Sequence, residues 1–366
     1  MPLNDEIDYM RKEIRTDGFG MSIGEWISLY KNKEIDIHPE FQRFYRWSET
    51  QKSNLIESIL LGIPIPPIFV SQRKEGVWDV IDGLQRLSTL YQFVGVLKDE
   101  NGNNVEPLKL EKTKYLPSLE GKKWNDPDDP DNSFTTEQRL LIKRAKIAVS
   151  IVLRESDQIA KYELFQRLNT GGANLTPQEV RNCIMVMVKP DFHKWIRALS
   201  SHEPYQECIA LSDKNLSEQY DIELALRFII FSTLDLEEYD RSQDVGEYLT
   251  DRMVEMAQDN HFDRNSVEAR FRDTFDHLND ALGSNAFRRY SDGQFKGGFL
   301  LSPFEVISFG LGFNYPEFPA PEETAVRTQG LYLDATYQQW SGSGVRANSR
   351  LPHLIPLGRE IFRNEH

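Results

Sequence analysis

The hydrophobic pattern of this 366-residue chain changes near residue 175. Before that point, short strand-like apolar runs alternate with runs of helical spacing. The run IPIPP at 63–67 predicts extended chain, and strand-like runs at 68–70 and 77–81 around a turn at 73–76 predict a hairpin. After Gly172, helical spacing continues through almost all of the remaining sequence, with candidate helices near 177–188, 190–199, 219–234, 244–258, 265–282, 303–312 and 351–363. A mixed first part and a helical second part are typical of an α+β protein. We therefore expect an α/β domain at 1–175, followed by a mostly α-helical domain at 176–366.

The composition is that of a soluble globular protein, with 39% hydrophobic and 27% charged residues. No apolar run approaches the ~18 residues that a membrane span requires. The opening MPLNDEIDYMRKEIR is charged and has no apolar segment of a secretory signal. Two cysteines, Cys183 and Cys208, are too few for a disulfide framework. These features predict a cytoplasmic protein with free thiols and no membrane association.

The net charge of −14 comes from 43 Lys and Arg against 57 Asp and Glu. A protein that coats nucleic acid by charge alone is usually basic. The balance therefore argues against broad DNA coating. It leaves room for a local basic pocket that takes a phosphate-bearing ligand, and for local contact with DNA.

The sharpest local feature is the segment Asp82-Gly83-Leu84-Gln85-Arg86, between a predicted strand and a predicted helix. Gly83 permits a tight turn and close backbone approach by a ligand. The amides that open the helix lack intrahelical acceptors, and the helix dipole favours an anion there. Arg86 adds a planar cation suited to bidentate phosphate contact.

Two interpretations of this turn stay open. In the functional one, Asp82 holds a metal ion, orients a water or pairs with Arg86, while Gln85 and Thr89 face solvent or a ligand from the polar side of the helix. In the structural one, Asp82 caps the helix and Arg86 is a solvated surface charge. Spacing alone favours the structural interpretation, because capped turns between strands and helices are common.

A second segment, FQRFYRW at 41–47, interleaves Arg43 and Arg46 with four aromatic side chains. Such a pattern suits stacking on a base together with phosphate contact. The alternative is that the aromatics belong to the core and the arginines shield them. A capping-box pattern, Ser48 with Gln51, follows directly and predicts the start of a helix.

A third segment, FQRLNTGG at 165–172, ends a predicted helix with ordinary C-cap residues. Thr176 and Glu179 then form a capping box for the next helix, so Glu179 is assigned a structural role. Arg181 and Asn182 lie one turn into that helix. Whether their side chains reach the ligand cavity is left open, because the spacing does not decide it.

Several familiar motifs are absent from the sequence. The seven histidines show no metal-ligand spacing, and neither cysteine has a CxxC partner. There is no Walker phosphate-binding loop, no G-x-S-x-G and no H-E-x-x-H. No HNH or PD-(D/E)xK nuclease constellation is recognisable either.

Four motifs occur in order: PEFQRFYRW, LLGIPIPPIFV, VIDGLQRLSTL and FQRLNTGGANLTPQEVRN. In this order they resemble the GmrSD-type restriction endonuclease N-terminal family, a relative of the ParB/sulfiredoxin-like fold. The resemblance covers roughly residues 20–185. It implies a ParB/sulfiredoxin-like first domain that binds and helps to hydrolyse a nucleoside triphosphate, in proteins that restrict foreign DNA.

The family motif Asp-Gly-Gln-Gln-Arg falls on Asp82, Gly83, Gln85 and Arg86, with Leu84 in place of the first Gln. The resemblance thus implies Asp82, Gln85 and Arg86 as catalytic residues, with Asp82 as the candidate ligand of Mg²⁺. The implied nucleotide-binding residues are Gly83, Thr89, Phe41, Gln42, Arg43, Arg46, Arg167 and Asn169.

Many relatives carry a further nuclease domain with a His-containing metal motif, which this sequence lacks. Three functions therefore remain in view. The first is a nucleoside triphosphatase of a defence system. The second is a nucleotide-switched regulator of a protein partner or of a homo-oligomer. The third is a DNA nickase that uses the same pocket, with Asp79 or Glu179 beside Asp82.

Overall fold

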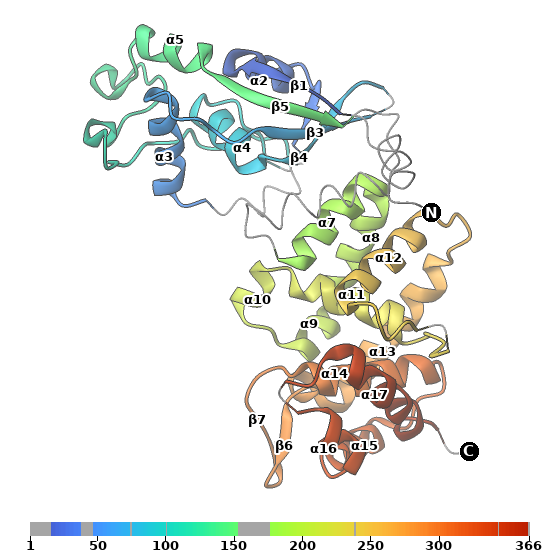
Figure 1. Ribbon diagram of the computed structural model, residues 1–366. Helices are drawn as coiled ribbons and strands as arrows, with labels where there is room; N and C mark the ends of the chain where they lie inside the picture. Colours follow the sequence, from blue (N-terminus) through green and yellow to red (C-terminus); the bar gives the residue numbers. More distant parts are fainter. Residues whose placement is uncertain are drawn as a thin grey trace. The chain divides into compact units, whose positions relative to one another are not determined.

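The computed structural model describes residues 16–37, 47–73, 75–99, 101–152, 176–237, 239–342 and 344–364. The chain divides into two compact units, residues 1–174 and residues 175–366 (Figure 1). The first unit contains a five-stranded mixed sheet with helices, and the second is mostly helical. The predicted α+β class is therefore confirmed.

The sheet of the first unit has the strand order β1-β5-β3-β4-β2. Its strands are β1 (Thr16–Ser22), β2 (Ile35–Asp36), β3 (Ile68–Gln72), β4 (Trp78–Asp82) and β5 (Lys146–Val152). β1 pairs antiparallel with β5, and β3 pairs antiparallel with β4, whereas β3–β5 and β2–β4 are parallel. The β3–β4 pair confirms the hairpin that the sequence predicted.

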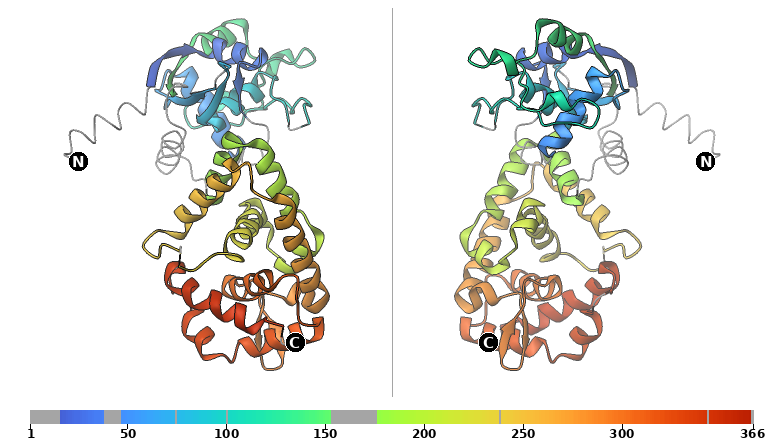
Figure 2. Two further views of the ribbon diagram at one scale, coloured as in Figure 1. Left: turned by 90° about the vertical axis from the view of Figure 1, so that its right-hand side faces the viewer. Right: turned by 90° about the vertical axis from the view of Figure 1, so that its left-hand side faces the viewer.

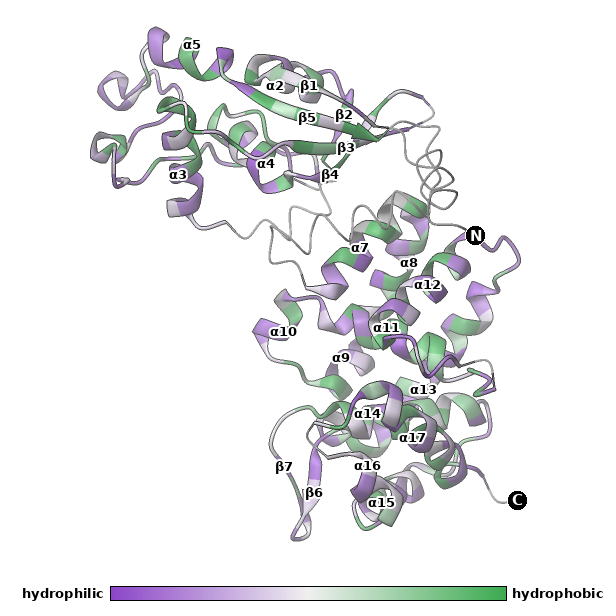
Figure 3. Cartoon of the chain, in the orientation of Figure 1, coloured by the Kyte–Doolittle hydropathy of each residue, from purple (hydrophilic) through white to green (hydrophobic). Residues whose placement is uncertain are grey.

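Four α-helices of the first unit pack into one apolar core with the sheet. They are α2 (Ile23–Lys31), α3 (Glu49–Leu60), α4 (Leu84–Phe93) and α5 (Thr136–Arg144), and η2 (Pro117–Leu119) and η3 (Pro130–Asn132) are short 3-10 turns. Serine or threonine caps open α2, α3 and α5 with complete capping boxes. Figure 3 shows the central strand β3 as mostly hydrophobic, as expected where helices cover a sheet.

Helix α4 is fixed firmly within this core. Tyr91 is buried, stacks on Tyr30 with ring centroids 4.2 Å apart, and donates a hydrogen bond from its hydroxyl to the Trp26 carbonyl at 3.2 Å. Leu87 and Leu90 are fully buried on the same helix. Because the body of α4 is anchored, its first turn is held at the end of β4.

The second unit consists of helices with one small hairpin (Figure 2). Its elements are α7 (Pro177–Val188), α8 (Pro190–Ser200), α9 (Glu203–Ile209), α10 (Asp213–Ser217), α11 (Tyr220–Phe231), α12 (Val245–Gln258), α13 (Arg264–Leu282), η4 (Gly283–Asn285), β6 (Arg289–Ser291), β7 (Gln294–Lys296), α14 (Leu301–Asn314), α15 (Pro321–Leu331), α16 (Ala335–Trp340) and α17 (Ala347–Ile361). The sequence predicted α7, α8, α11, α12, α13, α14 and α17, but not α9, α10, α15 and α16.

Two helices of the second unit approach each other unusually closely. A Cβ added at Gly310 of α14 would lie 2.3 Å from the Gly358 carbonyl oxygen of α17. A Cβ at Gly358 would lie 2.1 Å from the Val306 carbonyl oxygen. Glycine in a helix interior costs about 1 kcal/mol of helix propensity relative to alanine. Here it permits backbone contact that any side chain would block.

A ladder of buried ion pairs crosses the interior of the second unit. Arg181 Nη2 donates to Glu223 at 2.5 Å, and Arg227 Nη2 lies 2.8 Å from the other oxygen of Glu223. Arg227 also faces Glu305 at 3.7 Å, and Glu305 accepts two bonds from Arg350, at 2.7 and 2.8 Å. We call this set, Arg181–Glu223–Arg227–Glu305–Arg350, the ionic ladder. It joins α7, α11, α14 and α17.

Arg181 and Asn182 both have buried side chains in the second unit. Arg181 belongs to the ionic ladder, and Asn182 Oδ1 accepts a 2.8 Å bond from Gln178. Asn182 Nδ2 has no hydrogen-bond partner among the described residues. Among the described residues, no helix has both the length and the hydrophobicity needed to cross a membrane.

Candidate functional site

The candidate site is the turn from β4 to α4. Gly83 stands between them with φ 101° and ψ 10°, in the left-handed region that favours glycine. A Cβ at this position would lie 2.3 Å from Cδ1 of Ile68. The sequence therefore needs glycine at position 83 for two separate reasons, the backbone conformation and the close approach of β3.

Gly83 is also the N-cap of α4 and supplies no side-chain hydrogen bond to the first turn. A helix of this length leaves its opening amides without intrahelical acceptors. The positive end of the helix dipole lies at the same place. The turn therefore offers donors and a favourable potential to an anion.

Asp82 and Arg86 form an ion pair across this turn. Arg86 Nη2 lies 2.8 Å from Asp82 Oδ2 and donates a second, longer bond of 3.3 Å to the Pro67 carbonyl. The Arg86 side chain is only 12% exposed, and the Asp82 side chain is 23% exposed. The structural interpretation of the turn is therefore wrong on both counts: Gly83 is the N-cap, and Arg86 is not a solvated charge.

The guanidinium of Arg86 retains unused donor capacity. Its Nε is buried and has no hydrogen-bond acceptor among the described residues. A buried donor without an acceptor costs about 1–3 kcal/mol. A guanidinium that is held in place with a donor to spare is suited to bind an oxyanion.

The prediction that Thr89 faces solvent or a ligand is wrong. Thr89 is fully buried, and its hydroxyl donates to the Gln85 carbonyl one turn earlier at 2.7 Å. The helical wheel placed it on the polar side, but Ser88 beside it is fully buried as well. Helix α4 is thus covered over more of its circumference than its apolar stripe indicated. Gln85 is half-buried and stays a candidate.

Six predicted nucleotide-binding residues lie outside the residues that the structure describes: Phe41, Gln42, Arg43, Arg46, Arg167 and Asn169. The structure brings together Asp82, Gly83, Gln85 and Arg86 on one turn. Trp47, at the end of the aromatic segment, packs against the core of the first unit. For this one aromatic residue, the alternative of a core role is confirmed.

Sequence reasoning missed the part that Pro67 and Ile68 play at the turn. The run IPIPP at 63–67 was used only as evidence for extended chain. The last proline of that run presents its carbonyl to Arg86, and the next residue packs against Gly83. The restricted backbone of a proline run was the available signal, because it fixes carbonyl directions.

The other carboxylates considered for this site are engaged elsewhere. Asp79 accepts from Arg73 Nε at 2.8 Å, and Arg73 Nη2 binds Asp36 at 2.9 Å, at the opposite end of the hairpin from Asp82. Glu179 accepts from the Thr176 amide at 2.7 Å, as the capping box predicted. Within the described ranges, His, Cys, Asp and Glu side chains form no group of three or more that could hold a metal ion.

The first unit is thus an α/β domain with a glycine turn that presents an arginine–carboxylate pair at a helix N-terminus. Residues 23–186 match the model of a family described as the GmrSD restriction endonuclease, N-terminal domain. The match confirms that this segment resembles the GmrSD N-terminal family, as its motifs predicted. No curated protein and no solved structure matches the chain. The relation to the ParB/sulfiredoxin-like fold stays a prediction.

Proposed function

We propose that the first unit binds a nucleoside triphosphate at the Asp82–Arg86 turn and hydrolyses it, in a protein that restricts foreign DNA. The observation that carries the proposal is the position of Arg86. Its guanidinium is largely buried, is held by Asp82 and Pro67, and lies beside the uncapped start of α4. The family description, which names a restriction endonuclease, supports the cellular role.

Each residue of the turn has a part in this proposal. Gly83 allows a phosphate to approach the backbone, and the first amides of α4 donate to it. Arg86 stabilises the negative charge that develops during phosphoryl transfer, and such preorganised electrostatic stabilisation is the main source of catalysis in this class of reaction. Asp82 orients Arg86 through their 2.8 Å contact and positions a water, with Gln85 as a second polar group.

Mg²⁺ is proposed to arrive with the triphosphate. Proteins usually hold Mg²⁺ through one or two carboxylates together with substrate phosphates. Asp82 provides one carboxylate, and Arg86 engages only its Oδ2. The donor set therefore fits a metal bound mainly by phosphate, which would neutralise phosphate charge. Phe41, Gln42, Arg43, Arg46, Arg167 and Asn169 are proposed as further nucleotide contacts.

The test is phosphate release from ATP, GTP, CTP and UTP in the presence of Mg²⁺, with binding measured by thermal shift. We expect release from at least one nucleotide and its loss in Arg86→Ala. The matched control is Arg73→Ala, because Arg73 is also paired with carboxylates of the same sheet but lies at the other end of the β3–β4 hairpin. The control should keep most of the activity.

Three results would count against the proposal in different ways. Neither binding nor release with any of the four nucleotides would remove it. Tight binding without release would leave a nucleotide-switched regulator instead of an enzyme. Relaxation of supercoiled plasmid by the purified chain with Mg²⁺ or Mn²⁺, lost in Asp82→Asn, would favour the DNA nickase.

A further inference from the structure

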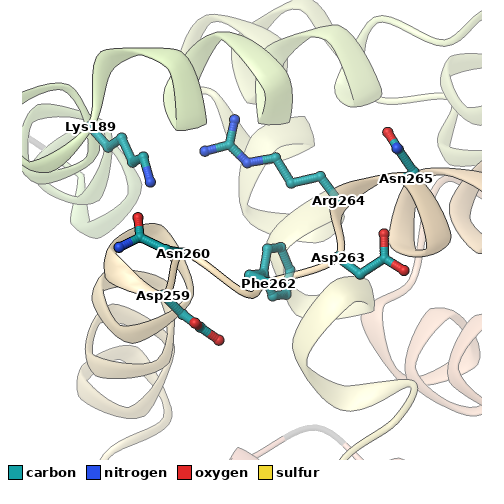
Figure 4. A pocket seen from close by; sticks show the side chains of 7 residues that line it. All are labelled: Lys189, Asp259, Asn260, Phe262, Asp263, Arg264 and Asn265. Carbon is teal, nitrogen blue, oxygen red and sulfur yellow. The ribbon is translucent and has the colours of Figure 1, made fainter.

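A cavity of about 370 Å³ lies in the second unit, between Lys189 at the start of α8 and the connection from α12 to α13. Residues within 259–265 form its other wall. Figure 4 shows the Lys189 ammonium, the Asn260 amide and the Arg264 guanidinium facing a common space, with Phe262 below them. Two cations from separate parts of the chain thus face one cavity, with the Asn260 side chain beside them.

The two cations of this cavity are not neutralised by carboxylates of the described residues. No ion pair joins Lys189 or Arg264 to such a carboxylate, whereas the arginines of the ionic ladder in the same unit are all paired. The two cations stand in a chain whose net charge is −14. Their mutual repulsion is relieved when an anion binds between them.

The two aspartates of the lining do not cancel this charge. Asp259 accepts a 2.8 Å bond from the His261 amide, and Asp263 caps α13 by accepting from the Ser266 amide at 3.1 Å. In Figure 4 both carboxylates point away from the space between Lys189 and Arg264. The two aspartates stabilise the connection between the helices, and the Lys189 and Arg264 side chains stay available to a ligand in the cavity.

Arg264 is held in place by aromatic side chains. Its guanidinium carbon lies 5.3 Å from the ring centroid of Phe192 and 5.8 Å from that of Trp195. Phe262 packs on the same two rings, with centroid distances of 6.2 and 5.9 Å. A guanidinium supported in this way loses less conformational entropy when it binds, and so gains affinity.

We propose that this cavity binds a phosphate group of a DNA strand. Arg and Lys side chains are the cations that contact phosphate oxygens in protein–DNA complexes. The volume exceeds that of a single phosphate and leaves room for the adjoining sugar. The assignment to DNA, in preference to a free phosphate compound, rests on the proposed restriction function. Since the acidic chain repels DNA over much of its surface, such a contact must be local.

The experiment measures binding of a short fluorescein-labelled DNA duplex by fluorescence anisotropy at several salt concentrations. The full chain is compared with Lys189→Gln, Arg264→Gln and the double variant. We expect the double variant to bind about tenfold more weakly, with the slope of log affinity against log salt reduced by about one for each phosphate that the variant no longer binds. Lys194→Gln, which removes an exposed lysine of α8, is the matched control and should bind as the unsubstituted chain does.

Two further measurements keep the result interpretable. Arg264→Lys keeps the charge and should retain most of the affinity for DNA. If Arg264→Gln weakened binding only by disturbing the packing against Phe192, Arg264→Lys would weaken it as well. Inorganic phosphate and ATP are titrated as competitors. Displacement of DNA only at millimolar phosphate supports a DNA site, while tight ATP binding that needs Lys189 and Arg264 assigns the cavity to a free nucleotide and overturns the proposal.

The proposal is also overturned if the double variant binds DNA with unchanged affinity and salt slope, or if Lys194→Gln weakens binding equally. Phosphate release from nucleotides is measured in the same variants and should be unchanged. A loss of DNA binding with normal release, or the reverse, separates failure of this site from failure of the Asp82–Arg86 site.

Discussion

The two units use the same pair of side chains, arginine and a carboxylate, in opposite ways. In the first unit, Asp82 and Arg86 form one pair at a turn, with the carboxylate 23% exposed and a donor of Arg86 without an acceptor among the described residues. In the second unit, the ionic ladder joins three arginines to two glutamates in the interior. The carboxylate of the first arrangement is partly exposed, whereas the two carboxylates of the second are only 12% and 0% exposed.

This difference teaches how to distinguish a candidate site from a structural network. Burial of charge alone does not indicate function, because ion pairs between helices also fix the way helices pack. The Asp82–Arg86 pair differs in lying beside a glycine with positive φ, at a helix start without a side-chain cap, with a carboxylate that is more exposed than those of the ladder. If this distinction holds, variants of the ladder should cost stability, and variants of the turn should cost activity.

The largest effect on stability is expected from Glu223→Ala. Burial alone would raise the pKa of Glu223, but Arg227 and Arg181 hold it below its usual value. Removing this carboxylate leaves two buried guanidinium groups without their shared partner, which typically costs about 3–5 kcal/mol. Hydrogen exchange measured by mass spectrometry reads the loss in α11, separately from the first unit.

The control for this change is Glu255→Ala, which removes one partner of an exposed pair with Arg252. Exposed pairs contribute at most about 1 kcal/mol. The comparison between the units fails if Glu223→Ala costs no more than the control. It also fails if Glu223→Ala abolishes phosphate release while the helical unit keeps its stability.

The next largest effect is expected from Gly83→Ala. The new Cβ would adopt a left-handed conformation and lie 2.3 Å from Ile68 Cδ1. Overpacking and backbone strain together should lower the free energy of unfolding of the first unit by about 1–3 kcal/mol. Urea unfolding checks the value, and nucleotide binding should weaken because the new contact displaces the turn that holds Arg86.

Gly76→Ala is the matched control for Gly83→Ala. Gly76 also has a positive φ, of 93°, but no atom lies within 4 Å of an added Cβ. Both variants carry the conformational strain, so the difference between them isolates the contact with Ile68. Equal losses in the two variants would show that the approach of β3 to the turn has no energetic consequence.

Much of this architecture follows from local signals in the sequence. The capping boxes at Ser48 and Thr176 predicted the starts of α3 and α7. In each box, the N-cap residue and the residue three positions later accept hydrogen bonds from each other's backbone amides. The β3–β4 hairpin followed from two strand-like runs on either side of a turn at Arg73–Gly76. The strand order could not be predicted, since β5 lies between β1 and β3 through pairings that are distant in sequence.

The sequence predicted which residues form the candidate site, but not how they are paired or buried. The motif placed Asp82 and Arg86 within one helical turn, but their pairing and burial depend on Pro67 and on the packing of α4. Thr89 was misplaced because a helical wheel assumes one buried side. The ionic ladder could not be predicted from the sequence, because its residues come from four helices and have no common spacing.

Asp82→Asn should separate activity from stability. The amide keeps an oxygen that can accept from Arg86, so the free energy of unfolding should fall by only about 1 kcal/mol. Loss of the negative charge should lower the rate of phosphate release by about 100-fold or more, as when one preorganised catalytic group is removed. Thermal unfolding and a phosphate-release assay are compared in the same preparation.

Asp79→Asn is the control for Asp82→Asn, because Asp79 lies in the same strand and is paired with Arg73. It should release phosphate at close to the normal rate. Similar rates in both variants would mean that the position of Asp82 at the start of α4 has no special role, and the contrast between an active turn and a structural ladder would lose its basis.

The smallest effect is expected from pH, through Glu57 in α3. Its carboxylate accepts from the Thr113 hydroxyl and from the amides of Tyr115 and Leu116 at 2.8 and 2.9 Å. The Thr113 bond lowers its pKa most, burial opposes this, and the two amides add to the lowering. A carboxyl whose pKa is lower in the folded state stabilises the fold above its unfolded pKa of about 4.3. That contribution is lost as the pH falls through the folded value.

We therefore expect the first unit to lose stability as the pH falls below about 4.3, and Glu57→Gln to remove this part of the pH dependence. Urea unfolding of both proteins over this pH range measures it, with Glu75→Gln as a variant that removes an exposed carboxylate. Because Glu57 is bonded to neutral donors and Glu223 to two arginines, Glu57→Gln should cost far less at neutral pH than Glu223→Ala. Comparable losses would show that hydrogen bonds to one carboxylate hold the first unit as firmly as the ladder holds the second.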